Sequence, residues 1–222
     1  MQTYHKINSL YKRSRDGKKM LFGEYSQEEF AYLADNRWIF TEKVDGTNIR
    51  VMYKGNEAFG DDLTFGGKTD NANIPAPLVN KLNELFTIDQ FRDIFPATLV
   101  DNIETSPSVC LYGEGYGAKI QAGGGNYNPK GVDFVLFDVK IGEWWLKRED
   151  VEDIAKKLGI MVVPIVGVGQ LWVMEKYCEE GFKSQWGDFI AEGIVARPLY
   201  ELRDRAGHRI ITKLKHKDFQ NV

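Results

Sequence analysis

The chain has 222 residues, of which 43% are hydrophobic and 27% charged, and its formal net charge is −3. This composition excludes a disordered chain, and no apolar stretch approaches the ~20 residues that span a bilayer. The charge balance also lacks the basic excess typical of nucleic-acid-binding domains, and the N-terminal residues lack the apolar core of a secretory signal. We therefore predict one globular domain over residues 1–222, in the cytoplasm and away from membranes.

The first elements in chain order are a helix and a group of strands. Ser26 and Glu29 form a capping-box pattern, which predicts a helix over residues 27–35. Short apolar runs separated by glycine-containing turns then predict antiparallel strands within residues 37–67. Later helices are predicted from apolar residues at helical spacing: after Pro77, after the capping pair Thr87 and Gln90, over residues 151–158 and over residues 173–180.

Further strands are interleaved with these helices, without a regular strand–helix alternation. This mixture predicts an α+β fold, with antiparallel sheets packed against flanking helices. The glycine-rich segment Ala122–Asn128 is expected to be a flexible loop, because no helix signal begins directly after it. The predicted strands are residues 109–112, 134–141, 161–166, 193–197 and 209–214.

The segment from Thr41 to Arg50 carries the strongest chemical signal. It places Lys43 between two carboxylates, with a glycine and an asparagine close behind. A lysine becomes a nucleophile when its ammonium loses a proton, and nearby charges control that loss. Lys43 is therefore a candidate covalent catalyst. The alternative is a surface hairpin whose turn is Asp45-Gly46, flanked by ordinary solvated charges.

Five short segments together resemble a known superfamily. Lys43-Val44-Asp45-Gly46 fits the Lys-x-Asp-Gly signature of covalent nucleotidyltransferases, which include ATP-dependent ligases and mRNA capping enzymes. Four later segments follow in the order of that superfamily's other motifs. The resemblance implies the nucleotidyltransferase (ATP-grasp-like) fold, with ATP held between two antiparallel sheets, and a single adenylation domain over residues 1–222. The four segments are Tyr112–Gly117, Phe134–Val139, Glu192–Arg197 and Thr212–Lys215.

The resemblance implies four catalytic residues. Lys43 would attack the α-phosphate of ATP, expel pyrophosphate and carry AMP on its nitrogen. Lys213 and Lys215 alternate along a predicted strand, so their ammoniums share one face, where they would contact the α-phosphate. Glu192 would help to hold the catalytic Mg²⁺, and Mn²⁺ could serve at the same oxygen-rich site.

A second set of residues is implied in nucleotide binding. Glu114, between two glycines, would bind the ribose hydroxyls, and Glu42 would read the adenine amino group. Phe137 would stack on the base, although a core phenylalanine is the alternative. Asp45 and Gly46 complete the set.

Two features indicate RNA as the substrate. Asn48 completes the pattern Glu-Lys-x-Asp-Gly-Thr-Asn, which is typical of RNA ligases similar to the second RNA ligase of phage T4. In that branch the asparagine engages the phosphate at the end being joined. Lys68 lies where the next phosphate-contacting motif generally has arginine, and lysine keeps the charge but lacks the bidentate fork.

The sequence thus predicts an ATP-dependent RNA ligase that joins an RNA 5′-phosphate to a 3′-hydroxyl through a lysyl-AMP intermediate. Two alternatives stay open: a polynucleotide 5′-adenylyltransferase that joins ends poorly, and an inactive nucleotide- or RNA-binding module. Only seven residues follow Lys215, so we expect no appended C-terminal domain. Basic clusters near both termini, including Arg203, Arg205 and Arg209, or an unknown protein partner would then supply RNA contacts; simple solvation of these charges is the alternative.

Overall fold

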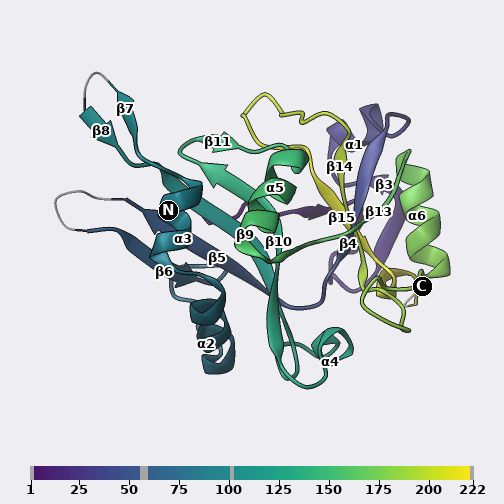
Figure 1. The fold of residues 1–222 in the computed structure, drawn as a ribbon. Helices are drawn as coiled ribbons and strands as arrows, with labels where there is room; N and C mark the ends of the chain where they lie inside the picture. The colour runs from purple at the N-terminus through teal and green to yellow at the C-terminus, as the bar shows by residue number, and fades with distance from the viewer. Residues whose placement is uncertain (1–2, 56–59, 101–102, 221–222) are drawn as a thin grey trace. The chain divides into compact units, whose positions relative to one another are not determined.

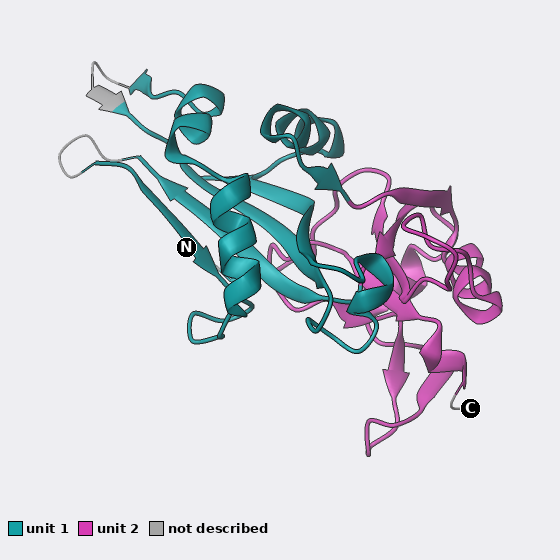
Figure 2. Ribbon diagram, turned by 60° about the horizontal axis from the view of Figure 1, so that its bottom comes forward, with its two compact units in different colours: residues 1–4, 45–162 teal, residues 5–44, 163–222 magenta. Residues whose placement is uncertain are grey.

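The computed structural model describes residues 3–55, 60–100 and 103–220. It has the predicted α+β architecture of mainly antiparallel sheets with flanking helices (Figure 1). The chain forms two compact units (Figure 2). Unit 1 comprises Met1–Tyr4 and Asp45–Val162, and unit 2 comprises His5–Val44 and Val163–Val222. In the described part of the chain, no helix has both the length and the apolar character that crossing a bilayer requires.

Unit 1 is built on a six-stranded sheet in the order β11-β10-β9-β5-β6, with β12 paired to β10. Its pairings are antiparallel except that of β12 with β10. The strands are β5 (Thr47–Lys54), β6 (Asp62–Gly66), β9 (Ser108–Gly117), β10 (Val132–Ile141), β11 (Trp144–Trp145) and β12 (Met161–Val162), with a separate hairpin of β7 (Thr98–Val100) and β8 (Ile103–Thr105). The helices are α2 (Ala76–Leu85), α3 (Ile88–Ile94), α4 (Gly124–Tyr127) and α5 (Arg148–Leu158).

The two faces of this sheet differ in character. Ile49, Val51 and Tyr53 alternate along β5 onto one face, where they join a buried core with residues of α2, α3 and α5. Asn48 and Arg50 therefore point to the other face. That polar face is the one on which candidate binding residues lie.

Unit 2 is built on a five-stranded sheet in the order β1-β15-β14-β4-β13. Only the β1–β15 pair is parallel. The strands are β1 (Asn8–Ser9), β4 (Trp38–Lys43), β13 (Ile165–Gly169), β14 (Gly193–Pro198) and β15 (Thr212–Lys215), with a hairpin of β2 (Tyr11–Arg13) and β3 (Met20–Tyr25). The helices are α1 (Glu28–Tyr32), α6 (Leu171–Glu180) and α7 (Lys217–Gln220).

The core of unit 2 lies on one face of its sheet. Phe40, Ile194 and Leu214 occupy neighbouring strands and are fully buried with side chains of α6, α1 and the β2–β3 hairpin. Side chains at alternate positions of the same strands point to the opposite face. Lys43 and Lys215 belong to that opposite face.

Several local predictions are confirmed. Thr87 and Gln90 form both bonds of a capping box at the start of α3. Helix α5 ends at Gly159, whose φ of 69° lies in the left-handed region that glycine adopts without strain.

Other predictions are wrong in ways that have clear causes. Ser26 does not cap α1, because its hydroxyl donates to the carbonyl of Ser9, and the helix covers only Glu28–Tyr32. The segment Ala122–Asn128 is not simply a loop, since it contains the short helix α4. The buried ring of Tyr127 helps to explain this order.

The hairpin interpretation of Asp45-Gly46 is also wrong. β4 pairs with β13 and β14, whereas β5 pairs with β6 and β9, so the strands on either side of this turn belong to different sheets. For the same reason residues 37–67 do not form one sheet. Two predicted strands change as well: residues 161–166 divide into β12 and β13, and the strand predicted from Arg209 begins only at Thr212.

Candidate active site

Lys43 lies at the end of β4, in a row that crosses three strands of unit 2. In the sheet register, Gly193 of β14 is directly opposite Lys43 on one side and Lys215 of β15 on the other. Directly opposed residues of antiparallel strands project to the same face. The two lysines therefore share a face because of strand pairing alone.

One carboxylate joins these two lysines. Glu192 Oε2 accepts a hydrogen bond from Lys43 Nζ at 2.6 Å, and its Oε1 lies 2.5 Å from Lys215 Nζ. The three side chains are only 19%, 12% and 23% exposed, in the order Lys43, Glu192 and Lys215. Two ammoniums around one carboxylate leave an excess of positive charge with limited screening by solvent, which suits a phosphate group.

Hydrogen bonds to the backbone hold Glu192 and Lys215 in place. The carbonyl of Glu192 accepts the amide of His216 at 3.0 Å. The amide of Lys215 donates to Asp218 at 3.1 Å, and Asp218 is itself paired with Arg13 at 2.8 Å. Asp218 is buried near the start of α7, and its hydrogen bond to Lys215 fixes the C-terminal end of β15.

Lys213 lies two residues before Lys215 on the same face of β15. It pairs in register with Val195 of β14 and with Ser9 of β1. Its side chain is half-buried. The predicted pair of lysines is therefore on one face, with Lys215 in contact with Glu192 and Lys213 one step further along the strand.

Glu42 projects to the opposite side of β4 from Lys43, because neighbouring residues of a strand alternate between faces. It is opposite Ile194 in register and is only 1% exposed. Its carboxylate accepts the hydroxyl of Ser184 at 2.6 Å and the amide of Gln185 at 2.9 Å. Burial raises the pKa of Glu42, while these two hydrogen bonds oppose the rise. Glu42 is thus separated from the lysine cluster by the sheet.

Asn48 and Glu114 form a pair on the polar face of unit 1. They are directly opposite each other in the β5–β9 register. Asn48 Oδ1 is buried and, within the described residues, has no hydrogen-bond partner. An acceptor without a partner beside a carboxylate suits a ligand with donor groups, such as hydroxyls.

Gly46 and Asp45 shape the backbone beside this pair. A Cβ atom on Gly46 would lie 2.3 Å from the carbonyl oxygen of Gly115, so only glycine fits there. Asp45 Oδ2 accepts the amide of Gly123 at 2.9 Å. Asp45 therefore anchors the glycine-rich segment that leads into α4.

Phe137 lies in a β-bulge of β10. The register shifts between Leu136 and Asp138, so Phe137 has no direct partner on β9. Bulges redirect side chains, and Phe137 is half-buried rather than enclosed in the core. Its ring meets that of Tyr4 with centroids 5.0 Å apart and an interplanar angle of 75°.

Lys68 is exposed, in a turn that a neighbouring arginine holds. Arg50, whose side chain is almost fully buried, donates to the carbonyl of Gly67 at 2.9 Å and to Asp70 at 2.7 Å. Replacing Arg50 would therefore remove both hydrogen bonds that hold this turn. Lys68 is thus available to solvent on an ordered turn.

Of the three arginines predicted to contact RNA near the C-terminus, Arg209 does not fit the prediction. Arg209 is buried and pairs with both oxygens of Glu201, at 2.7 and 2.8 Å. Its charge is therefore already neutralised. Arg203 and Arg205 are exposed and remain candidates.

The carboxylates of the described residues bear on where a divalent ion could be held. Within the described residues, no group of three or more His, Cys, Asp or Glu side chains is arranged to hold a metal ion. Ions that accompany nucleotides take most of their ligands from phosphate oxygens and water, so one protein carboxylate is enough. Glu192, the carboxylate between the two lysines, fits that need.

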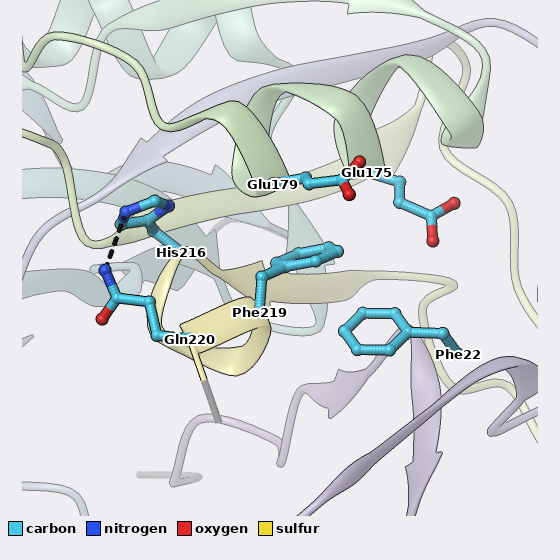
Figure 3. A pocket seen from close by; sticks show the side chains of 6 residues that line it. All are labelled: Phe22, Glu175, Glu179, His216, Phe219 and Gln220. Carbon is cyan, nitrogen blue, oxygen red and sulfur yellow. Dashed lines mark hydrogen bonds between the residues drawn. The ribbon is translucent and has the colours of Figure 1, made fainter. Parts of the chain in front are cut away.

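A cavity near α7 has a different character. It lies against the α6 and α7 helices of unit 2, and Figure 3 shows two phenyl rings, two carboxylates and the hydrogen bond between His216 and Gln220. Carboxylates beside apolar rings repel phosphate, so this cavity is unsuited to a nucleotide's phosphates. Its lining residues are Phe22, Glu175, Glu179, His216, Phe219 and Gln220.

Sequence reasoning missed four residues that position the candidates. Ser184 and Gln185 hold Glu42, Asp218 holds Lys215, and Tyr4 packs on Phe137. All four lie outside the segments that resemble motifs, and Ser184, Gln185 and Tyr4 act through contacts between distant parts of the sequence. No local pattern marks such contacts.

Comparison with known proteins identifies the class. The fold is the nucleotidyltransferase fold of RNA ligases, and the sequence model of the RNA ligase family matches residues 36–215. The chain belongs to the RNA ligase family. No curated protein sequence matches it.

Several solved structures of an RNA ligase from Naegleria gruberi share this fold. A variant with ATP and Mn has a TM-score of 0.61 at 19% identity, covering 86% of this chain and 54% of that chain. A second variant with ATP and Mn has a TM-score of 0.64 at 16% identity, covering 98% and 59%. The ligase with PPi has a TM-score of 0.60 at 18% identity, covering 96% and 61%. The chain thus spans between 54% and 61% of the length of these relatives.

Proposed function

We propose that this chain performs the nucleotidyl-transfer chemistry of an ATP-dependent RNA ligase. The observation that carries the proposal is the contact of one carboxylate, Glu192, with the amines of Lys43 and Lys215 at 2.6 and 2.5 Å. Family membership supports RNA as the substrate. The Naegleria structures with ATP and Mn support a nucleotide and a divalent ion as its companions.

The first step forms a lysyl-AMP. Lys43 Nζ attacks the α-phosphorus of ATP, a nitrogen–phosphorus bond forms, and the bond to the pyrophosphate oxygen breaks. The amine must first give up a proton, and Glu192 Oε2 is the acceptor already in contact with it. Lys215 remains as a cation where negative charge grows on the phosphate oxygens.

The next two steps join the RNA. The adenylate passes from Lys43 to the 5′-phosphate of one RNA end, which restores the free amine. The 3′-hydroxyl of the other end then attacks that phosphate, a phosphodiester forms, and AMP leaves. Lys213 and Lys215 provide positive charge for these phosphates on one strand face.

Mg²⁺, with Mn²⁺ as a substitute, would enter with the nucleotide, and Glu192 would hold it directly or through water. Such an ion neutralises phosphate charge during transfer. On the polar face of unit 1, Glu114 would accept the ribose hydroxyls and Phe137 would stack on the base. Asn48 and Lys68 would serve the phosphate of the RNA end.

Transfer of label from α-labelled ATP to the protein tests the first step. We expect one labelled band that is lost in Lys43→Ala and kept in Lys176→Ala, a matched change of an exposed lysine on α6. Label that persists in Lys43→Ala, or none in the unaltered protein, would overturn the proposal.

The fate of 5′-phosphorylated RNA separates the remaining alternatives. Joined product supports a ligase. Accumulation of AMP-capped RNA without joining supports a polynucleotide 5′-adenylyltransferase. Binding of ATP or RNA without either product supports an inactive binding module.

A further inference from the structure

The polar face of the unit 1 sheet has the properties of a nucleoside platform. It carries the half-buried ring of Phe137, the carboxylate of Glu114 and the buried Oδ1 of Asn48, for which the described part of the chain offers no hydrogen-bond partner. Aromatic faces stack on bases with any sequence, and acceptor groups pair with ribose hydroxyls. Because Phe137 lies in a β-bulge and has no direct partner on β9, its ring needs contacts from elsewhere to keep one orientation.

Tyr4 makes the contacts that fix this ring. Its ring centroid lies 5.0 Å from Phe137, 5.1 Å from Tyr112 and 5.7 Å from Trp145. The contacts with Phe137 and Trp145 are edge-to-face, at 75° and 87°. Such arrangements are favourable and directional, so they restrict rotation of each ring.

The hydroxyl of Tyr4 is anchored to the residue that follows Phe137. It donates to Asp138 Oδ2 at 2.5 Å, and Asp138 is fully buried. A buried carboxylate is costly without hydrogen-bond donors, which makes this contact structurally important. Tyr4 therefore holds the bulge both through its ring and through its hydroxyl.

We propose that Tyr4 is a positioning residue that fixes Phe137 as the surface on which the nucleobase stacks. This inference rests on the proposed function, since it assumes that a nucleotide is the ligand. Tyr4 acts through its contacts with Phe137 and Asp138, and it belongs with unit 1, whereas Lys43 belongs with unit 2. Its loss should weaken recognition of the base and leave contacts with phosphate unchanged.

Binding measurements with two ligands separate base recognition from phosphate recognition. Isothermal titration would give dissociation constants for ATP and for inorganic tripolyphosphate, which has no base. We expect Tyr4→Ala to raise the dissociation constant for ATP about tenfold, and Tyr4→Phe to raise it about threefold. In both variants the dissociation constant for tripolyphosphate should change by less than about twofold. Titrations without a divalent ion keep the chemical step out of the measurement.

A matched control is Tyr53→Phe. It also removes a tyrosine hydroxyl bonded to an aspartate, Asp61 at 3.1 Å, but on the core face of the same sheet. We expect it to leave both dissociation constants unchanged. A structural defect alone would reduce the fraction of protein that binds, without raising the dissociation constant for ATP.

The outcomes also separate this inference from the proposed function. Equal weakening of ATP and tripolyphosphate in the Tyr4 variants, or no change in either, would overturn the role of Tyr4 even if Lys43 is adenylated. Selective loss of ATP affinity without any labelling of Lys43 would support Tyr4 and overturn the ligase chemistry. An unaltered protein that does not bind ATP would overturn both.

Discussion

Lys43 and Lys215 lie on the same face of one sheet, each directly opposite Gly193 of the strand between them. Their ammoniums contact different oxygens of Glu192, so the nucleophile and a phosphate-binding cation are held by one acid. The chemistry of the site therefore depends on the charge of Glu192 as much as on Lys43. Substitutions that remove the charge of Glu192 or Lys215 but keep much of the side-chain shape therefore test the site.

Replacing Glu192 by glutamine keeps the side-chain shape but removes the charge and the proton acceptor for Lys43. We expect the rate of lysine adenylation to fall by about 100-fold or more, because a charge near the reacting atoms is lost. Single-turnover labelling with α-labelled ATP measures the rate. Glu180→Gln, an exposed acid on α6 paired with Lys176 at 3.8 Å, is the control. Equal rates in Glu192→Gln and the control would contradict the role of Glu192.

Replacing Lys215 by methionine removes one cation and keeps much of its apolar stem. We expect adenylation to slow by about 100-fold, since positive charge beside the phosphates stabilises the transition state. Lys213→Met should have a smaller effect on this step, because Glu192 contacts Lys215 and Lys43. The same labelling assay ranks the two variants, and a larger loss in Lys213→Met would reverse our assignment.

Gly46→Ala should disrupt the backbone beside the nucleophile. The new Cβ would lie 2.3 Å from the carbonyl of Gly115, which cannot move without breaking the β5–β9 register. We expect a loss of roughly 2–3 kcal/mol in the free energy of unfolding, measured by urea denaturation. Gly125→Ala is the control, because no atom of the residues that the structure describes lies within 4 Å of its added Cβ. Similar stabilities of the two variants would show that the turn adapts.

The two buried thiols should make stability fall at alkaline pH. Burial raises the pKa of Cys110 to about 11 and that of Cys178 to about 12, from an ordinary value of 9.0. The folded protein thus keeps these protons where the unfolded chain releases them. The stabilisation is complete below pH 9 and is lost as pH rises through 11 and 12.

Urea denaturation between pH 7 and pH 10.5 measures this effect. We expect the free energy of unfolding to fall less steeply above pH 9 in Cys110→Ala and Cys178→Ala than in the unaltered protein. Both thiols should also resist iodoacetamide at pH 8 until urea is added, because thiolate is the reactive form. Rapid alkylation of the folded protein would contradict their burial.

Reversing the charges of Arg203 and Arg205 should weaken RNA binding without changing adenylation of Lys43. Both side chains are exposed, whereas Arg209 is buried against Glu201 and is left unaltered. We expect a smaller dependence of RNA affinity on salt, since fewer phosphate contacts release counterions. Lys156→Glu with Lys157→Glu, on α5, reverses the same amount of charge elsewhere. Unchanged RNA affinity would indicate that the arginines are only solvated.

The sequence by itself determined much of the local structure and the chemical identity of the candidates. Short apolar runs bounded by turns predicted β5 and β10, and apolar residues at helical spacing predicted α2, α3, α5 and α6, because side-chain period depends only on local backbone geometry. The order of motifs predicted the nucleotidyltransferase fold and the RNA ligase family. The spacing of Lys213 and Lys215 was enough to place them on one face, again from period two.

Only the tertiary structure decided which strands pair and which carboxylate meets Lys43. Asp45-Gly46 had the local features of a hairpin turn, yet β4 and β5 pair with strands far along the chain. Arg209 had the same local character as Arg205, yet Glu201 buries and neutralises it. Strand pairing and burial depend on which distant segments pack together. A short stretch of sequence does not specify those distant partners.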